Sequence, residues 1–186
     1  MSNAPHKLST ADLRRTTVIG SAITVFAEAG YLGTSVATIA QHAGISQAYV
    51  FKLFPSKELL FVTALEHCFT LVQTALEQGA DASPDTSPDG VLDAMGGAYA
   101  ELIADRSLLM LQVHAQSAAS VPDIGAALRK GLRTITRFVL SRSGASDEAV
   151  QRFFAYWQLC HLIVVTGIEA DNADWARVIT KGIRHY

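Results

Sequence analysis

Residues 43–61, "AGISQAYVFKLFPSKELLF", decide how the rest of the chain is interpreted. A short run of mixed polarity follows Gly44 and stops at Pro55. Glycine tolerates a positive φ angle, and proline cannot continue a helix. The run therefore predicts a helix of two turns between a tight turn and a break. Because two turns bury little surface, this helix needs a partner helix, or it is presented to another molecule.

Residues 36–55 fit a helix-turn-helix in a single register. Ala40 supplies the small side chain that the first helix needs where the second helix crosses it. Gly44 occupies the turn, where a positive φ angle is required. The inside of the angle between the two helices needs apolar side chains, and the sequence supplies Ile39, Ala43, Ile45, Val50 and Leu53.

The outer face of the second helix is then free, and in this motif it enters the major groove of DNA. Gln47 can pair with an adenine edge, Tyr49 with a thymine, and Lys52 with a phosphate. Hydroxyls before the first helix and Lys57 after the second are expected to meet the phosphate backbone. The predicted DNA contacts are Thr34, Ser35, Ser46, Gln47, Ala48, Tyr49, Phe51, Lys52 and Lys57.

Six of these residues also have a purely structural interpretation. Thr34, Ser35 and Ser46 are typical helix N-caps. Tyr49 could pack inside the module, as could Phe51, and Lys57 could be a solvated charge. The capping and DNA-binding interpretations are compatible, so both stay open from sequence alone.

The stretch 26–61, "FAEAGYLGTSVATIAQHAGISQAYVFKLFPSKELLF", resembles the DNA-binding module of TetR-type transcriptional regulators. The resemblance implies an all-helical homodimer with an inducer cavity in its C-terminal bundle and a dimer interface on its last two long helices. Three positions depart from the family pattern. Phe51 stands where a tyrosine usually contacts the DNA backbone, Tyr49 replaces a small Thr or Ser, and Ala37 replaces a residue that is often basic or polar. These departures imply an altered operator preference.

Helical periodicity dominates the chain, and no sustained period-2 alternation is present. The fold class predicted is all-α: a three-helix DNA-binding module, residues 1–55, followed by a helical ligand-binding and dimerisation bundle, residues 56–186. Pro, Ser, Asp and Gly make residues 79–90 the clearest linker. The first helix is expected to begin at Ser9 or Thr10. The expected helices are 10–30, 36–43, 47–54, 57–78, 90–105, 107–119, 123–142, 147–168 and 173–185.

Residues 95–116, "MGGAYAELIADRSLLMLQVHAQ", combine small residues with apolar and polar side chains of the kind that line ligand pockets. The candidate effector-binding residues are Met95, Tyr99, Met110, His114, Trp157 and His161. A methionine or aromatic residue at helical spacing is more often plain core, so that alternative stays open. Neither histidine has a metal ligand four residues away, so no metal site is predicted. The helix 147–168 is apolar on more than one side, which favours a homodimer.

Composition bounds the remaining possibilities. The 186 residues are 49% hydrophobic with a formal net charge of −2, but residues 1–60 carry five Lys or Arg against three Asp or Glu. The two cysteines lie far apart in apolar patterns and indicate buried thiols in a reduced compartment. The N-terminal sequence lacks the apolar segment of a signal peptide, and the apolar stretch 159–168 is too short to span a bilayer. A cytoplasmic protein without membrane contact is expected.

No catalytic constellation, phosphate loop or zinc spacing is recognisable, so we predict neither an enzyme nor a cofactor. The predicted function is a repressor that a small apolar or aromatic effector releases from double-stranded operator DNA. The resemblance to TetR-type regulators also implies that the helix 57–78 transmits the effector signal to the DNA-binding module. One alternative stays open, a helical interaction protein that has lost operator binding.

Overall fold

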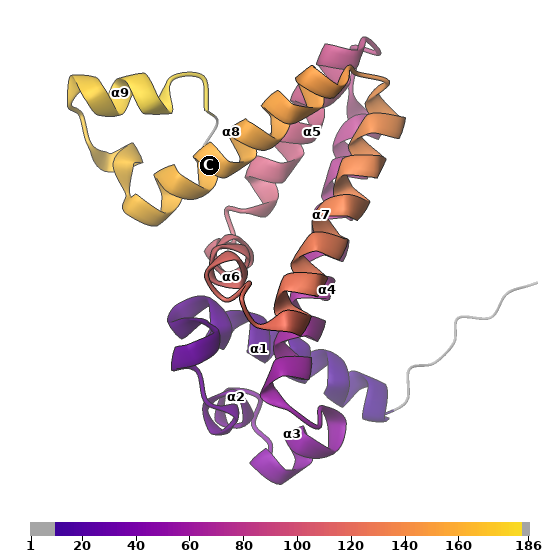
Figure 1. Cartoon of the computed structure of the whole chain (residues 1–186), viewed down its shortest axis with the longest axis vertical. Helices are drawn as coiled ribbons and strands as arrows, with labels where there is room; N and C mark the ends of the chain where they lie inside the picture. The colour runs from indigo at the N-terminus through magenta and orange to yellow at the C-terminus, as the bar shows by residue number, and fades with distance from the viewer. Residues whose placement is uncertain (1–9, 184–186) are drawn as a thin grey trace, which may run out of the picture.

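The computed structural model describes residues 10–183, which form nine α-helices, one short 3-10 helix and no strand (Figure 1). The all-α prediction is confirmed. The elements in chain order are α1 (Thr10–Gly33), α2 (Val36–His42), α3 (Gln47–Leu53), α4 (Lys57–Ala82), α5 (Pro88–Leu102), α6 (Arg106–Ser117), α7 (Pro122–Ser143), α8 (Asp147–Thr166), η1 (Ile168–Ala170) and α9 (Asp174–Thr180). Ser9 and the end of the helix expected over 173–185 lie outside the described residues.

Serine side chains begin most of these helices, as the sequence predicts. The Ser46 hydroxyl accepts a hydrogen bond from the Tyr49 backbone N–H, and Ser56 accepts one from Leu59. Of the two candidate caps of α2, Ser35 is the one used, and it accepts from the Thr38 N–H. Each of these bonds satisfies a backbone donor that the first turn of a helix leaves without a partner.

The linker expected over 79–90 is shorter in the structure, because α4 continues through Gly79 to Ala82. A Cβ atom on Gly79 would lie 2.7 Å from the Ala94 carbonyl oxygen and 2.7 Å from the Ala98 Cβ. The glycine therefore allows α5 to approach α4 closely, and it does not end the helix. Only residues 83–87 connect the two helices.

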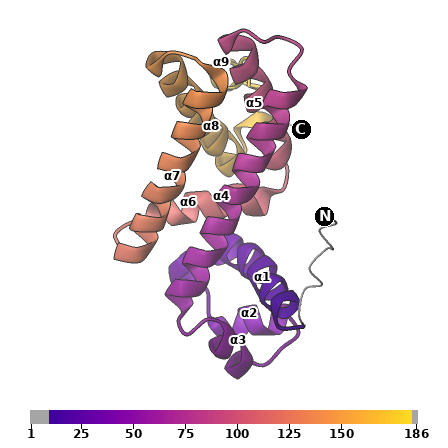
Figure 2. The same cartoon turned by 90° about the vertical axis from the view of Figure 1, so that its right-hand side faces the viewer.

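Helix α4 is the central element of the molecule and runs from the DNA-binding module to the far end of the bundle (Figure 2). By length and composition alone it could cross a membrane, yet half of its most apolar window is buried. Helices α1, α5 and α7 pack around it. The helix is therefore the core of the fold and not a membrane span.

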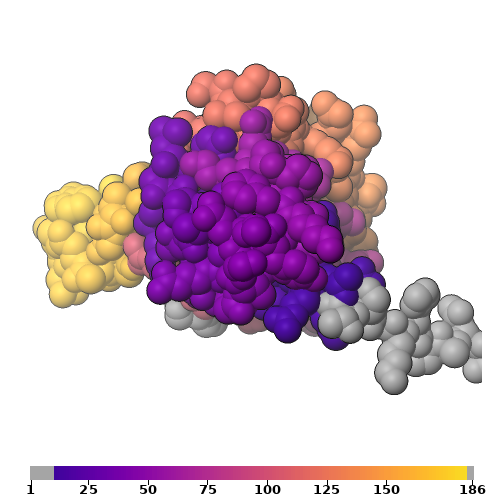
Figure 3. Space-filling model, turned by 90° about the horizontal axis from the view of Figure 1, so that it is seen from below, coloured from indigo at the N-terminus to yellow at the C-terminus, as the bar shows by residue number. Residues whose placement is uncertain are grey.

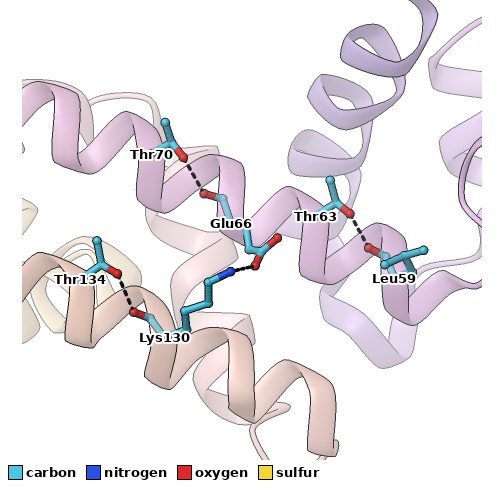
Figure 4. Close-up of polar contacts among 6 residues, drawn as sticks. All are labelled: Leu59, Thr63, Glu66, Thr70, Lys130 and Thr134. Carbon is cyan, nitrogen blue, oxygen red and sulfur yellow. Dashed lines mark hydrogen bonds and ion pairs between the residues drawn. The ribbon is translucent and has the colours of Figure 1, made fainter. Parts of the chain in front are cut away.

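The contact between α4 and α7 carries an ion pair between Lys130 Nζ and Glu66 Oε1, 2.7 Å apart (Figure 4). Both side chains are well exposed, so the pair stabilises the fold little. Packing decides the contact instead. A Cβ on Gly131 would fall 2.2 Å from the Phe69 ring, so the absence of a side chain there lets the ring lie against α7.

Candidate nucleic-acid interface and effector pocket

The helix-turn-helix has the geometry that the sequence predicts. Gly44 adopts φ 66°, and the next residue, Ile45, donates its N–H to the Ala40 carbonyl at 3.0 Å. Ile39 and Val50 are completely buried between the helices, while Ala40 is 3% exposed where they cross. The short helix α3 is thus supported from inside, which leaves its other face free.

That free face lies at the end of the molecule that is formed by helices α1–α4 (Figure 3). Gln47, Ala48 and Lys52 are exposed, Phe51 is 40% exposed, and Tyr49 is half-buried. The face combines an amide, a phenol, a phenyl ring and an ammonium group within two turns of helix. These groups can hydrogen-bond to base edges, pack on a thymine methyl and pair with a phosphate.

A second site is a half-open cavity of about 480 Å³ between α5 and α8, far from α3. Gly96 and Tyr99 contribute one wall, and Phe153 and Trp157 contribute the other. The Tyr99 and Trp157 rings lie 4.1 Å apart between centroids, and Phe154 stacks on Trp157 at 5.5 Å. Residues 181–183, which follow α9, close a further side of the cavity. The lining thus combines aromatic rings with four charged residues, Asp89, Asp93, Arg152 and Lys181.

A buried polar cluster lies behind this aromatic wall. The Tyr99 hydroxyl is 2.7 Å from His161 Nε2, and Gln112 Nε2 donates to the same hydroxyl at 3.3 Å. Burial lowers the pKa of His161 to about 4 and raises the pKa of Tyr99 well above its ordinary value, so both side chains are neutral near pH 7. His161 Nδ1 has no hydrogen-bond partner among the described residues.

Residues 18–64, which span this helix-turn-helix, match the family model described as bacterial regulatory proteins, tetR family. The DNA-binding module is that of the TetR family. The protein is a transcriptional regulator that binds DNA through this module. No curated protein matches the chain significantly.

Solved structures share the fold over nearly the whole chain. A TetR-family regulator from Agrobacterium tumefaciens has a TM-score of 0.71 at 19% identity, covering 94% of this chain and 96% of its own. The putative transcriptional regulator from Pseudomonas aeruginosa PAO1 gives 0.67 at 21%, with 95% and 92% covered. FadR from Bacillus subtilis, solved in complex with stearoyl-CoA, gives 0.69 at 17%, with 89% and 93% covered. Below 25% identity, such likeness shows the fold alone.

Two of the predicted DNA contacts have structural roles inside this TetR-family module. Thr34 is 4% exposed, and its hydroxyl donates to the Val25 carbonyl oxygen at 3.3 Å. Lys57 Nζ donates to the Tyr31 carbonyl oxygen at 2.8 Å and to the Thr34 carbonyl oxygen at 3.1 Å. Both side chains therefore hydrogen-bond within the module, to the carbonyl oxygens of Val25, Tyr31 and Thr34, and their contacts with DNA stay predictions.

Arg15 is a structural residue of the module that sequence reasoning missed. Its guanidinium donates to the Leu53 carbonyl oxygen at 2.8 Å and lies 4.2 Å from the centre of the Phe54 ring. The arginine thereby fastens the end of α3 to α1, 38 residues earlier in the chain. No local spacing signals such a contact.

The six candidate effector residues divide into two groups. Tyr99 and Trp157 line the cavity, and His161 touches Tyr99 behind it. The others are Met95, Met110 and His114, which do not line the cavity. Met95 is fully buried core, and His114 faces the DNA-binding module, with Nε2 3.2 Å from the Ala27 carbonyl oxygen. Sequence reasoning also missed the wall formed by residues 181–183.

Proposed function

We propose that this TetR-family regulator is a cytoplasmic homodimer that represses transcription and leaves its operator when a small apolar or aromatic effector binds. The observation that carries the proposal is a free, chemically mixed face on an α3 helix that is rigidly supported from behind. In a dimer, two such faces would reach major-groove half-sites separated by about 34–36 Å or a multiple of that distance.

Gln47, Ala48 and Tyr49, near the start of α3, are proposed to read base edges. Lys52 is proposed to pair with a phosphate, with Ser35 and Ser46 at the two helix starts nearby. Phe51 would pack on the sugar-phosphate surface without donating a hydrogen bond. Lys57 donates hydrogen bonds to carbonyl oxygens, whereas Lys52 is an exposed cation on α3. A substitution of Lys52 therefore tests this interface most directly.

Replacing Lys52 by alanine should weaken binding to all DNA sequences by a similar factor. It should also reduce the slope of log affinity against log salt concentration by about 1. The reason is that one fewer phosphate is neutralised. Fluorescence anisotropy over a salt series measures both quantities. Lys130→Ala is the control, because Lys130 is also an exposed lysine but lies on α7, where it pairs with Glu66. Identical slopes for Lys52→Ala and the wild type would reject this contact and favour an interaction protein without operator function.

The aromatic cavity supports an apolar or aromatic effector. Its walls hold several rings, and its volume of about 480 Å³ lies in the range of small-molecule sites. FadR from Bacillus subtilis, which shares the fold, is known with stearoyl-CoA, a ligand with a long apolar chain. Asp89, Asp93, Arg152 and Lys181 also line the cavity, so charges of both signs accompany its apolar surface.

Filling the cavity tests this assignment. Gly96→Leu places a side chain among the rings, where a Cβ alone would lie 3.9 Å from Phe153. The neutral dye N-phenyl-1-naphthylamine should bind the wild type saturably with enhanced emission, and Gly96→Leu should weaken that binding about tenfold or more. Gly20→Leu is the control, because nothing lies within 4 Å of a Cβ there. Equal dye binding by both variants would place the effector site elsewhere.

The outer face of α8 supports the homodimer. Residues 153–168 contain no charged residue, yet Leu162 is 51% exposed and Val165 is 37% exposed. An apolar helix face of this length requires cover, and a second copy covers it symmetrically.

Helix α6 supports a route for the effector signal besides α4. Gln112 of α6 bonds to the cavity residue Tyr99, and His114, about half a turn further, touches Ala27 of α1. Any displacement of Tyr99 by an effector would then act on α1 through α6, in addition to acting along α4 as the sequence suggested. The effector releases the operator if it binds this displaced state more tightly.

A further inference from the structure

The C-terminal arm, defined here as η1 and α9 (residues 168–180), stands away from the bundle. Helix α9 packs on η1 and has no comparable contact with any other helix that the structure describes. Figure 1 shows the arm extending from the end of α8, on the side of the molecule away from α7, and Figure 3 shows it protruding from the body. The arm therefore has few helix contacts within its own chain, although residues 181–183, which follow it, return to the cavity between α5 and α8.

The arm nevertheless carries large apolar side chains on its outer side. Trp175 is 53% exposed and Val178 is 76% exposed, three residues apart on one face of α9. The opposite side holds Ala176, which is fully buried. Because both sides of this helix are apolar, the outer side is suited to a second contact surface.

The arm is also acidic where it leaves α8. Glu169 and Asp171 are exposed, and Asp174 is paired with Arg177 of the same helix. No basic side chain is paired with Glu169 or Asp171 in residues 10–183. Asp171 Oδ1 accepts a hydrogen bond from the Ala173 N–H, so the two exposed carboxylates stand within six residues of Trp175 in the chain without a basic partner.

Helix α7 has a complementary surface, which we call the arginine stripe: Arg129, Arg133 and Arg137. The three residues are spaced by four and exposed, so they lie along one line of the helix. None forms an ion pair within the described part of the chain. Guanidinium groups pair with carboxylates and also stack on indole rings, which suits both features of the arm.

We propose that the arm of one copy clasps the arginine stripe of a second copy, a contact that rests on the homodimer proposed above. The indole of Trp175 stacks on the stripe, and Glu169 and Asp171 pair with its guanidinium groups. Figure 1 shows the arm and α7 on opposite sides of the molecule, so we assign the contact to a second copy. Twofold symmetry forms the contact twice in a dimer, beside the apolar face of α8.

The experiment measures dimer dissociation by sedimentation together with acrylamide quenching of tryptophan fluorescence in the full chain. Trp157 is 3% exposed, so quenching reports mainly on Trp175. We expect quenching of Trp175 to fall as the protein dimerises. Trp175→Ala should raise the dimer dissociation constant about tenfold. The control Leu32→Ala removes an 86% exposed side chain at the end of α1 and should leave that constant unchanged.

Charge exchange distinguishes the clasp from a general apolar contact. Arg133→Glu and Glu169→Lys should each weaken dimerisation about threefold or more, and the double variant should recover most of the loss. A chain that stays monomeric at every concentration would overturn the homodimer and the clasp together. Two results together would overturn the clasp alone. Acrylamide would quench Trp175 equally in the monomer and the dimer, and Trp175→Ala would dimerise like the wild type.

Discussion

Phe61→Ala should lower the free energy of unfolding by about 3–5 kcal/mol, the cost typical of removing a buried phenyl ring. Phe61 is fully buried in α4, with its ring centroid 4.8 Å from that of Phe26 and 5.4 Å from that of Tyr31. These rings come from α1, so the cluster joins the DNA-binding module to the first turns of α4. Urea denaturation at fixed protein concentration measures the loss.

Phe51→Ala is the control for this prediction, because it removes the same ring from an exposed position on α3. It should change the stability by no more than about 0.5 kcal/mol while acting on DNA binding. A loss below about 1 kcal/mol for Phe61→Ala would mean that the ring cluster does not hold the module to the bundle.

Gly30→Ala should destabilise the protein by about 3 kcal/mol, the sum of backbone strain and a steric contact. Gly30 lies within α1 at φ 69° and ψ −179°, a region that essentially only glycine occupies. A Cβ there would also lie 2.9 Å from Nδ1 of His114. The same denaturation experiment measures this loss. Gly20→Ala is the matched control on the same helix and should be neutral or stabilising by up to about 1 kcal/mol, since its Cβ meets nothing within 4 Å.

A double-mutant cycle separates the two causes. His114→Ala removes the ring that the new methyl group would strike but leaves the backbone strain in place. The pair Gly30→Ala and His114→Ala should therefore recover part of the loss, about 1 kcal/mol, and not all of it. Full additivity of the two substitutions would show that α6 does not press on Gly30.

The N-terminal module could be predicted from sequence because its determinants are local. Gly44, Ala40 and the serine caps act on residues within a few positions of themselves, and all three behave as expected. The helix limits in the bundle follow from the same kind of signal. The exception is the helix end predicted near Gly79, and the reason is clear. Glycine often ends helices, but it also permits close packing, and only the position of α5 decides between these roles.

Side-chain directions could not be predicted in the same way. Lys57 turns back to the end of α1 because the carbonyl oxygens of Tyr31 and Thr34 converge there, which depends on the path of the chain through Gly30. The contact of Arg15 with α3 joins positions 38 residues apart. Met95 and Tyr99 have the same apolar spacing on α5, yet only Tyr99 borders the cavity, because helical periodicity identifies a buried face without showing where space remains.

The division at residue 55 and the DNA contacts of α3 stay predictions. Helix α4 begins at Lys57, close to the proposed boundary, but the buried core runs without a break from α1 through α8.

The most direct test of the central claim, operator binding through α3, is fluorescence anisotropy of labelled DNA from the region flanking the protein's own gene, at two salt concentrations. The account predicts saturable binding with a stoichiometry of one dimer per site, tighter than binding to a scrambled duplex and strongly weakened by salt. Equal, weak binding to both duplexes, unchanged in Lys52→Ala and not improved in Phe51→Tyr, would contradict it.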